Sequence, residues 1–157
     1  MGVAADCLSF HDCGYGAQNF ENGLEPEFVV WRNDDWPSYQ LAVVVDDHDQ
    51  GITEVVRGRD LLDSTPRQLS IYAALSWPAP EFFHIPLCTA LDGQKLSKQN
   101  LAPSVHEDAV VATLKRALLL LAQDAMWLDA STPARLLQQA AAAWSPLRLQ
   151  RKCLAEV

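Results

Sequence analysis

The segment Lys95–Gln99 places two lysines three positions apart, with a serine between them. A lysine head is a compact charge with three donors, so Lys95 and Lys98 can follow the oxygens of a polyphosphate, and the Ser97 hydroxyl can assist. The glycine-containing run 91–94 in front of them indicates a loop. A phosphate-binding loop and a solvated surface loop are both compatible with the pentapeptide alone.

Residue types that bind metals are scattered along the chain. The four cysteines, Cys7, Cys13, Cys88 and Cys153, never form a Cys-x-x-Cys pair. A zinc site would need at least one close pair, so we expect free thiols and no zinc site in this chain. The four histidines are equally dispersed, and His84, which opens an apolar stretch, is predicted to be a packed and satisfied side chain instead of a base.

Short strands are the first elements that must position these residues. They are expected at 28–32, 39–46, 53–57 and 82–87. The run Tyr39–Asp46 is apolar on both faces for most of its length, as in a strand covered on both sides. A turn is predicted at 33–37. The acidic connection 46–51 lacks the spacing of a calcium loop and is predicted to be a hairpin turn.

A helix is predicted from Ser64–Pro66 to about Ser76. Either Ser64 or Thr65 would cap the free amide donors, and Pro66 would occupy the first turn, where its missing donor costs nothing. The segment Lys95–Gln99, called the lysine loop below, follows the strand predicted at 82–87. Loops at the carboxyl ends of strands carry the chemistry of open α/β sheets.

The carboxyl-terminal region is predicted to be helical. Ser104–Glu107 reads as a capping box, and the helix behind it has an apolar stripe. A second helix is expected from Thr132–Pro133 to Trp144. The predicted organisation is a poorly ordered connector at 1–27, an α/β region at 28–103 and a small helical bundle at 104–157 that covers a core.

Composition and charge limit the possible functions. With 157 residues and 49% hydrophobic content, the chain can build a core of ordinary size. Its net charge is −8, and most of the excess acid lies before residue 61, so a broad RNA-binding field is not expected. The longest uncharged apolar run, Ala117–Ala122, is too short to cross a membrane, and a cytoplasmic location is expected.

Five blocks between Trp31 and Asn100 resemble the later part of the catalytic domain of glutamyl-type class I aminoacyl-tRNA synthetases. They are YQLAVVVDD at 39–47, GITEVVRG at 51–58, TPRQ at 65–68, HIPL at 84–87 and KLSKQ at 95–99. Their order and spacing match the family. The resemblance implies an α/β fold, namely the C-terminal part of a Rossmann-like catalytic domain, followed by the helical bundle.

The resemblance also implies site residues. Lys98 matches the family's ATP-contacting lysine and Lys95 would support it; the ATP-binding positions are Lys95, Leu96, Ser97, Lys98 and Gln99. Tyr39 and Arg57 match the positions that hold the side-chain carboxylate of glutamate, where an arginine fork and a phenol supply donors. Without this match, an ion pair of Arg57 with Asp60 or Glu54 and a packing role for Tyr39 would be favoured.

The implied activity is the ATP-dependent activation of L-glutamate to glutamyl-adenylate, with magnesium accompanying ATP. Within the family, the Lys-Gln-Asn ending of the loop and the short remaining chain resemble the glutamyl-Q tRNA(Asp) synthetase branch, which transfers glutamate to the queuosine base of tRNA(Asp). No His-Ile-Gly-His-like tetrapeptide is present. We therefore expect the N-terminal half of the catalytic domain to be missing and the chain alone to be inactive.

Two alternatives remain open from the sequence. The chain could be a catalytically dead remnant that acts as a protein-binding or regulatory module, because a sheet without its partner strands exposes edges. It could also be a fragment of a glutamyl-tRNA synthetase that charges a tRNA 3′ end.

Overall fold

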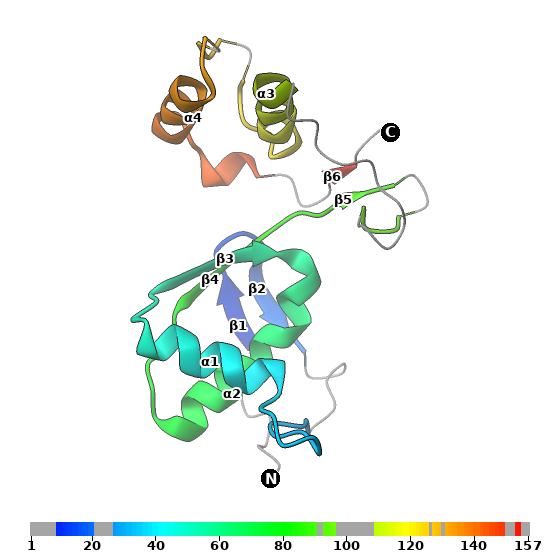
Figure 1. Ribbon diagram of the computed structural model, residues 1–157, viewed down its shortest axis with the longest axis vertical. Coiled ribbons are helices and arrows are strands. Elements are labelled where there is room, and N and C mark those ends of the chain that lie inside the picture. The colour runs from blue at the N-terminus through cyan, green and yellow to red at the C-terminus, as the bar shows by residue number, and fades with distance from the viewer. Residues whose placement is uncertain are drawn as a thin grey trace. The chain divides into compact units, whose positions relative to one another are not determined.

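The computed structural model describes most of the chain and divides it into two compact units (Figure 1). The described residues are 9–20, 27–90, 93–96, 109–125, 127–129, 131–149 and 153–154. The first unit is Met1–His84 and the second is Ile85–Val157. The predicted boundary at 103/104 lies outside the described residues and stays a prediction.

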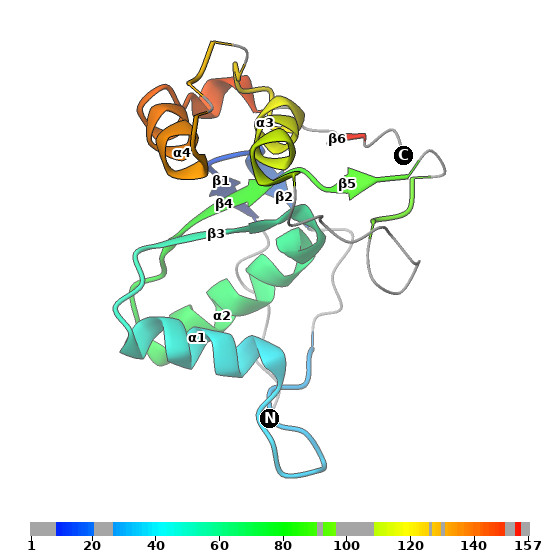
Figure 2. The same ribbon diagram turned by 45° about the horizontal axis from the view of Figure 1, so that its top comes forward.

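Strands and helices alternate in the first unit after an initial hairpin. The elements are β1 (Ser9–Asp12), β2 (Gly16–Asn19), α1 (Tyr39–Asp49), β3 (Glu54–Gly58), the 3-10 helix η1 (Arg59–Ser64), α2 (Thr65–Leu75) and β4 (Glu81–Ile85). β3 pairs with β4. The amide of Glu81 donates to the carbonyl of Thr53 near the start of the pair, and the side chains of Arg57 and His84 are hydrogen-bonded near its end. The residue numbers of the two strands therefore increase in the same direction, and the strands run parallel. Figure 2 shows α1 and α2 on one side of this pair.

The strand predicted at 39–46 is wrong, because these residues form helix α1. Ser38 caps the helix by accepting a hydrogen bond from the amide of Leu41 at 3.4 Å. Val44 is fully buried and packs with Ile71 of α2. Packing on α2 therefore overrides the strand preference of the valine run. The hairpin turn predicted at 46–51 is also wrong: the helix continues to Asp49.

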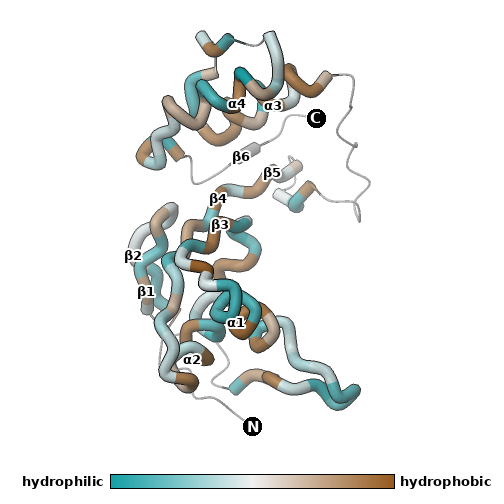
Figure 3. The backbone as a smooth tube through the Cα atoms, turned by 60° about the vertical axis from the view of Figure 1, so that its left-hand side comes forward, coloured by the Kyte–Doolittle hydropathy of each residue, from teal (hydrophilic) through white to brown (hydrophobic). Residues whose placement is uncertain are grey.

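The segment before α1 is a turn without a regular strand, so the strand predicted at 28–32 is wrong. Its only β contact is an isolated bridge between Trp31 and Pro37. The turn predicted at 33–37 is confirmed, since the amide of Arg32 donates to the carbonyl of Trp36 at 2.8 Å. Figure 3 shows this turn as hydrophilic.

Three predicted elements around the parallel pair are confirmed. The strand expected at 53–57 is β3, the helix from residue 64 or 65 to about 76 is α2, and the strand expected at 82–87 is β4. The predicted side-chain cap of α2 is wrong, because neither Ser64 nor Thr65 bonds to the first amides of the helix. The Thr65 hydroxyl instead accepts from Arg57 at 2.8 Å.

A β-hairpin lies within the segment 1–27, so the poorly ordered connector predicted there is wrong for residues 9–19. β1 and β2 pair antiparallel, with Ser9 opposite Asn19. The Asp12 carboxylate accepts hydrogen bonds from the amides of Gly14 and Tyr15, at 3.0 and 2.8 Å, and so stabilises the turn. Gly14 is pressed against β4, and a Cβ there would overlap the carbonyl oxygen of His84.

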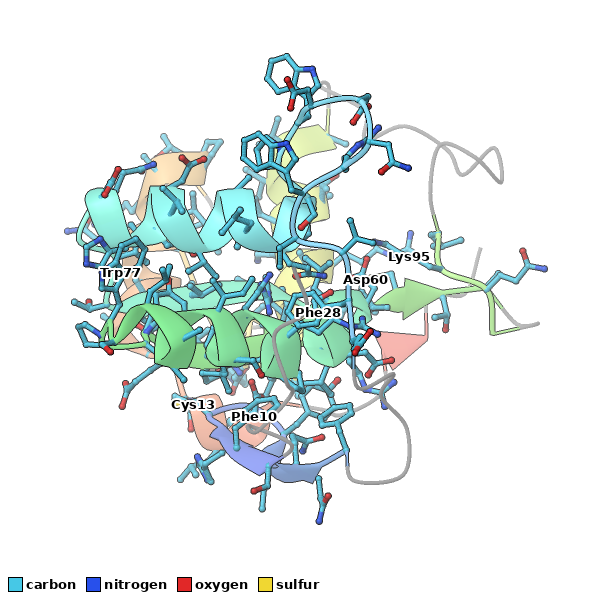
Figure 4. The ribbon with its side chains drawn as sticks, turned by 90° about the horizontal axis from the view of Figure 1, so that it is seen from below. Phe10, Cys13, Phe28, Asp60, Trp77 and Lys95 are labelled. Atoms are coloured by element: carbon cyan, nitrogen blue, oxygen red, sulfur yellow. The ribbon has the colours of Figure 1, made fainter. Side chains whose placement is uncertain are left out.

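The apolar core of the first unit lies between α1 and α2. Val44, Ile71 and Tyr72 are its buried residues; Phe28, Val30, Leu41 and Trp77 pack against them. Figure 4 shows Trp77 at the end of α2 beside α1, where its ring stacks on His48 with centroids 3.8 Å apart. This packing fixes α1 and α2 against each other.

In the part of the second unit that the structure describes, helices α3 (Val110–Leu120) and α4 (Pro133–Ala142) accompany a short parallel strand pair. The strand pair consists of β5 (Cys88–Thr89) and β6 (Cys153–Leu154), and the 3-10 helix η4 (Pro146–Arg148) follows α4. Both predicted helices are confirmed, and Thr132 caps α4 by accepting from the amide of Arg135 at 3.2 Å. The capping box predicted at 104–107 lies outside the described residues.

The core of the second unit lies between α3 and α4. It contains Leu118, Ala125, Leu136 and Ala140. No helix within the described residues has both the length and the apolar character needed to cross a membrane.

Candidate functional site

A buried polar cluster lies on the parallel strand pair of the first unit. Asp12 ends β1, Arg57 lies in β3, Thr65 begins α2 and His84 lies in β4. Asp12, Thr65 and His84 are 0% exposed. Buried polar groups cost free energy unless they are hydrogen-bonded, so their partners define the site.

Asp12 and His84 form the innermost pair. Asp12 Oδ2 lies 2.6 Å from His84 Nδ1, and the backbone amide of His84 lies 3.2 Å from the same oxygen. Asp12 Oδ1 accepts from the turn amides of Gly14 and Tyr15. The carboxylate therefore accepts from both the ring and the backbone of His84 while it also closes the hairpin turn.

Arg57 is held by the outer side of this pair. Its Nε donates to His84 Nε2 at 2.9 Å, and its Nη2 donates to Thr65 Oγ1 at 2.8 Å and to the carbonyl of Leu61 at 3.3 Å. The guanidinium carbon lies 5.0 Å from the centre of the Phe82 ring, within the range of a cation–π contact.

These contacts fix the tautomer of His84. Arginine can only donate, so His84 Nε2 must accept and the ring proton must reside on Nδ1, facing Asp12. Burial lowers the pKa of His84, and the hydrogen bond to Asp12 opposes this change. His84 is therefore neutral near pH 7 and adds no positive charge beside Arg57.

Burial also lowers the pKa of Arg57, while the nearby Tyr39 and Asp47 act in the opposite direction. An arginine side chain stays protonated under all physiological conditions. Among the described residues, Arg57 is therefore the cation of this cluster, and Tyr39, the first residue of α1, is one of the groups that act on its pKa.

Two of the predicted site residues, Tyr39 and Arg57, lie in the first unit. Tyr39 begins α1 and is half exposed, and it is the first of the charged or polar neighbours that act on Arg57. The described hydrogen bonds of Arg57 go to His84, Thr65 and the carbonyl of Leu61, and the charge of Asp60 also acts to raise its pKa.

The lysine loop begins in the second unit, where its first two residues return towards β5. Lys95 forms an isolated antiparallel β-bridge with Thr89, and the amide of Leu96 donates to the carbonyl of Cys88 at 2.9 Å. Gly93 has a φ of +83°, which a glycine adopts without strain, and closes the turn.

The rest of the lysine loop is not described. Ser97, Lys98 and Gln99 lie outside the described residues. The predicted convergence of Lys98 and Arg57 on one cleft therefore stays a prediction.

The sequence predicts the packing role of His84 in the buried cluster but does not indicate Asp12. His84 was predicted to be a packed and satisfied side chain, which is confirmed. Asp12 was missed because it fell in a segment predicted to be a loop, and its partner is 72 residues away. The pattern of an aspartate two residues before a glycine was the available signal for the turn.

Metal-binding side chains do not gather in the part of the chain that the structure describes: no three His, Cys, Asp or Glu residues form a possible site there. The donors found around Arg57 are instead suited to an anion, because a guanidinium and a phenol both donate hydrogen bonds.

Comparison with known proteins identifies relatives over most of the chain. The family described as tRNA synthetases class I (E and Q), catalytic domain, matches residues 4–122. A Klebsiella pneumoniae protein named Glutamyl-Q tRNA(Asp) synthetase is 46% identical over 150 residues, which are 94% of this chain and 51% of that protein. A Chromobacterium violaceum protein of the same name is 52% identical over 92 residues, 59% of this chain and 31% of that protein.

Solved structures share the fold. The crystal structure of a glutamate tRNA ligase from Elizabethkingia meningosepticum, in complex with its amino acid, superposes with a TM-score of 0.68 at 21% identity. The match covers 95% of this chain and 34% of that one. The expected α/β fold of a class I synthetase catalytic domain is thereby confirmed. The chain spans about half the length of the first of these curated relatives.

Proposed function

Because the chain belongs to the family of class I tRNA synthetases (E and Q), through its match to the catalytic domain, we propose that it is part of an ATP-dependent ligase that activates L-glutamate. The reaction joins the α-carboxylate of glutamate to the α-phosphorus of ATP and releases pyrophosphate. We place the complete enzyme in the cytoplasm, and we propose the N-terminal half of the catalytic domain as the partner that completes the site.

The recognition of glutamate is the part that the geometry supports best. We assign the side-chain carboxylate of glutamate to Arg57 and Tyr39. The supporting observation is that Arg57 is held by neutral partners: His84, Thr65 and the carbonyl of Leu61 accept its hydrogen bonds without cancelling its charge. A half-buried guanidinium whose hydrogen-bond partners are all neutral is suited to an anion, and a carboxylate supplies one.

The lysine loop is assigned to the phosphates of ATP. Negative charge grows on the leaving pyrophosphate, so a lysine at that position stabilises the transition state more than the ground state. We assign this role to Lys98, with Lys95 in support and with Leu96, Ser97 and Gln99 completing the ATP-binding loop. Magnesium would accompany the phosphates of ATP, and no residue of this chain is assigned to it.

The acceptor is proposed to be the queuosine base of tRNA(Asp). The support is that relatives from Klebsiella, Citrobacter and Chromobacterium at 44–52% identity carry the name Glutamyl-Q tRNA(Asp) synthetase. A second candidate is the 3′ end of a tRNA, because an Ehrlichia chaffeensis protein named Glutamate–tRNA ligase 2 is 46% identical over 110 residues.

The test of activation is glutamate-dependent exchange of pyrophosphate into ATP. The 157-residue chain would be assayed alone and after mixing with a separately made N-terminal half of the Klebsiella relative. We expect exchange only in the mixture. Absence of exchange in both would contradict the ligase and favour a remnant that only binds other proteins, while exchange by the chain alone would contradict the need for a second half.

The test of the acceptor uses the active mixture with labelled glutamate. We expect transfer to tRNA(Asp) that contains queuosine and none to the same tRNA with guanine in its place. Equal labelling of both, lost on removing the 3′ adenosine, would favour the tRNA ligase.

A further inference from the structure

We propose that His84 is a positioning residue for the substrate-binding arginine: its Nε2 orients Arg57 so that Nη1 faces the glutamate carboxylate. This inference rests on the proposed function, because it assumes that Arg57 binds glutamate. It concerns residues that neither the sequence pattern nor any comparison assigned to a ligand.

The positioning follows from how the donors of Arg57 are divided. Nε is taken by His84 and Nη2 by Thr65 and the carbonyl of Leu61. Among the described residues, Nη1 is the one nitrogen of the guanidinium without a hydrogen bond. The edge of the guanidinium formed by Nε and Nη2 is therefore occupied, and Nη1 is the nitrogen that can donate to a carboxylate. A second donor has to come from another group, for which the Tyr39 hydroxyl is the candidate.

His84 can hold Arg57 only in one tautomer, and Asp12 selects it. Asp12 Oδ2 accepts the proton of Nδ1 at 2.6 Å, which leaves Nε2 with a lone pair for Arg57. The hairpin that carries Asp12 is in turn fixed to β4, because the amide of Cys13 donates to the carbonyl of Phe82 at 2.8 Å. Three strands thus determine the direction of one guanidinium.

Two isosteric substitutions separate positioning from packing. The amide nitrogen of asparagine can replace Nδ1 of a histidine, so His84→Asn keeps a donor to Asp12 but has nothing to offer Arg57. The amide oxygen of glutamine can replace Nε2, so His84→Gln keeps an acceptor for Arg57 but loses the donor to Asp12. Each variant loses one hydrogen bond, and only the first releases the guanidinium.

The readout is the affinity for L-glutamate of the mixture of this chain with the N-terminal half, measured by NMR titration, with Arg57→Ala as the reference. We expect His84→Asn to weaken binding about tenfold, as for the loss of one hydrogen bond to a charged group. His84→Gln should weaken it clearly less. Equal losses in the two variants, or no loss in either while Arg57→Ala abolishes binding, would overturn the positioning role alone.

A different result would remove the proposed function. If the mixture with the wild-type chain does not bind glutamate, or the mixture with Arg57→Ala binds it as well, the glutamate site is wrong and the role of His84 falls with it. A second measurement needs no variant: long-range proton–nitrogen correlation of the His84 ring should show a proton on Nδ1 and none on Nε2. A protonated Nε2 near pH 7 would overturn the inference even if both variants fail to fold.

Discussion

The two units of the chain differ in what they bury. The first unit encloses Asp12, Thr65, Gln68 and His84 at 0% exposure, next to its apolar core. The core of the second unit is leucine and alanine between α3 and α4, and Gln123, which bonds to Leu121 and Ser145, is the one buried polar residue among its described residues. A buried apolar side chain needs only close packing, whereas a buried polar group needs a hydrogen-bond partner placed in a particular direction. The buried cluster of the first unit therefore specifies a geometry, as a binding site requires, whereas the helical core of the second unit depends mainly on close apolar packing.

The largest effect is expected from removing the centre of the polar cluster. Asp12→Ala leaves the ring and amide of His84 and the amides of Gly14 and Tyr15 without their acceptor. We expect a loss of about 3–5 kcal/mol in the free energy of unfolding, because several donors lose their acceptor at once and each buried donor left unsatisfied costs about 1–3 kcal/mol. Urea unfolding measures it. Asp49→Ala, at an exposed position, is the matched control, and equal losses in both would contradict the comparison.

The next effect concerns turnover instead of stability. Lys98→Ala should raise the barrier of the exchange reaction by about 2.7–4 kcal/mol, by analogy with the removal of one transition-state donor. The assay uses the active mixture with the N-terminal half. Arg57→Ala should mainly raise the glutamate requirement. Small and equal effects of both substitutions would contradict the assigned roles.

The apolar unit should respond to a cavity without a change in ligand binding. Leu136 is 0% exposed between α3 and α4, while its neighbour Leu137 is 48% exposed. We expect Leu136→Ala to lower the free energy of unfolding by about 3 kcal/mol, within the range for such cavities. Leu137→Ala should cost much less. A loss of glutamate affinity in folded Leu136→Ala would contradict the division of roles between the units.

A smaller loss is expected at the start of α4. Thr132 accepts from the amide of Arg135, so Thr132→Ala should cost about 1 kcal/mol. Thermal unfolding followed by circular dichroism measures it. Thr132→Ser keeps the acceptor and is the control; a Ser variant as unstable as the Ala variant would show that the hydroxyl does not cap the helix.

The smallest and most gradual change is expected from pH. Burial lowers the pKa of His84, so the unfolded chain binds a proton at a higher pH than the folded chain does. The contribution of neutral His84 is therefore complete above the ordinary histidine pKa of about 6.5 and is lost as pH falls from there through the lowered value. Urea unfolding at stepped pH should show this slope, and His84→Gln should flatten it. An unchanged slope in that variant would assign the effect to other groups.

The sequence predicted the elements around Arg57 better than their contacts. β3, α2 and β4 followed from apolar runs and a proline-marked helix start. The valine run of α1 is predicted to be a strand because β-branched residues favour strands, whereas Val44 of this run packs in a helix against Ile71 and Tyr72. Residues with local signals were thus predictable, and those fixed by tertiary packing were not.

The buried cluster itself was beyond local patterns. The hydrogen bond between Asp12 and His84 joins positions 72 residues apart. Family resemblance supplied Arg57, but no periodicity or spacing indicates what accepts its donors. The Lys98 end of the loop stays a prediction.

The close approach of Gly14 to β4 determines which substitutions the chain tolerates at this position. A side chain at this position would strike the carbonyl oxygen of His84, whereas one at Gly16 would meet nothing within 4 Å. Saturation mutagenesis should therefore return glycine alone at position 14, and at position 16 asparagine and aspartate as well, because these tolerate its φ of +73°. The two glycines would then be required for different reasons. Gly14 allows β4 to approach closely, whereas Gly16 only allows the backbone to turn.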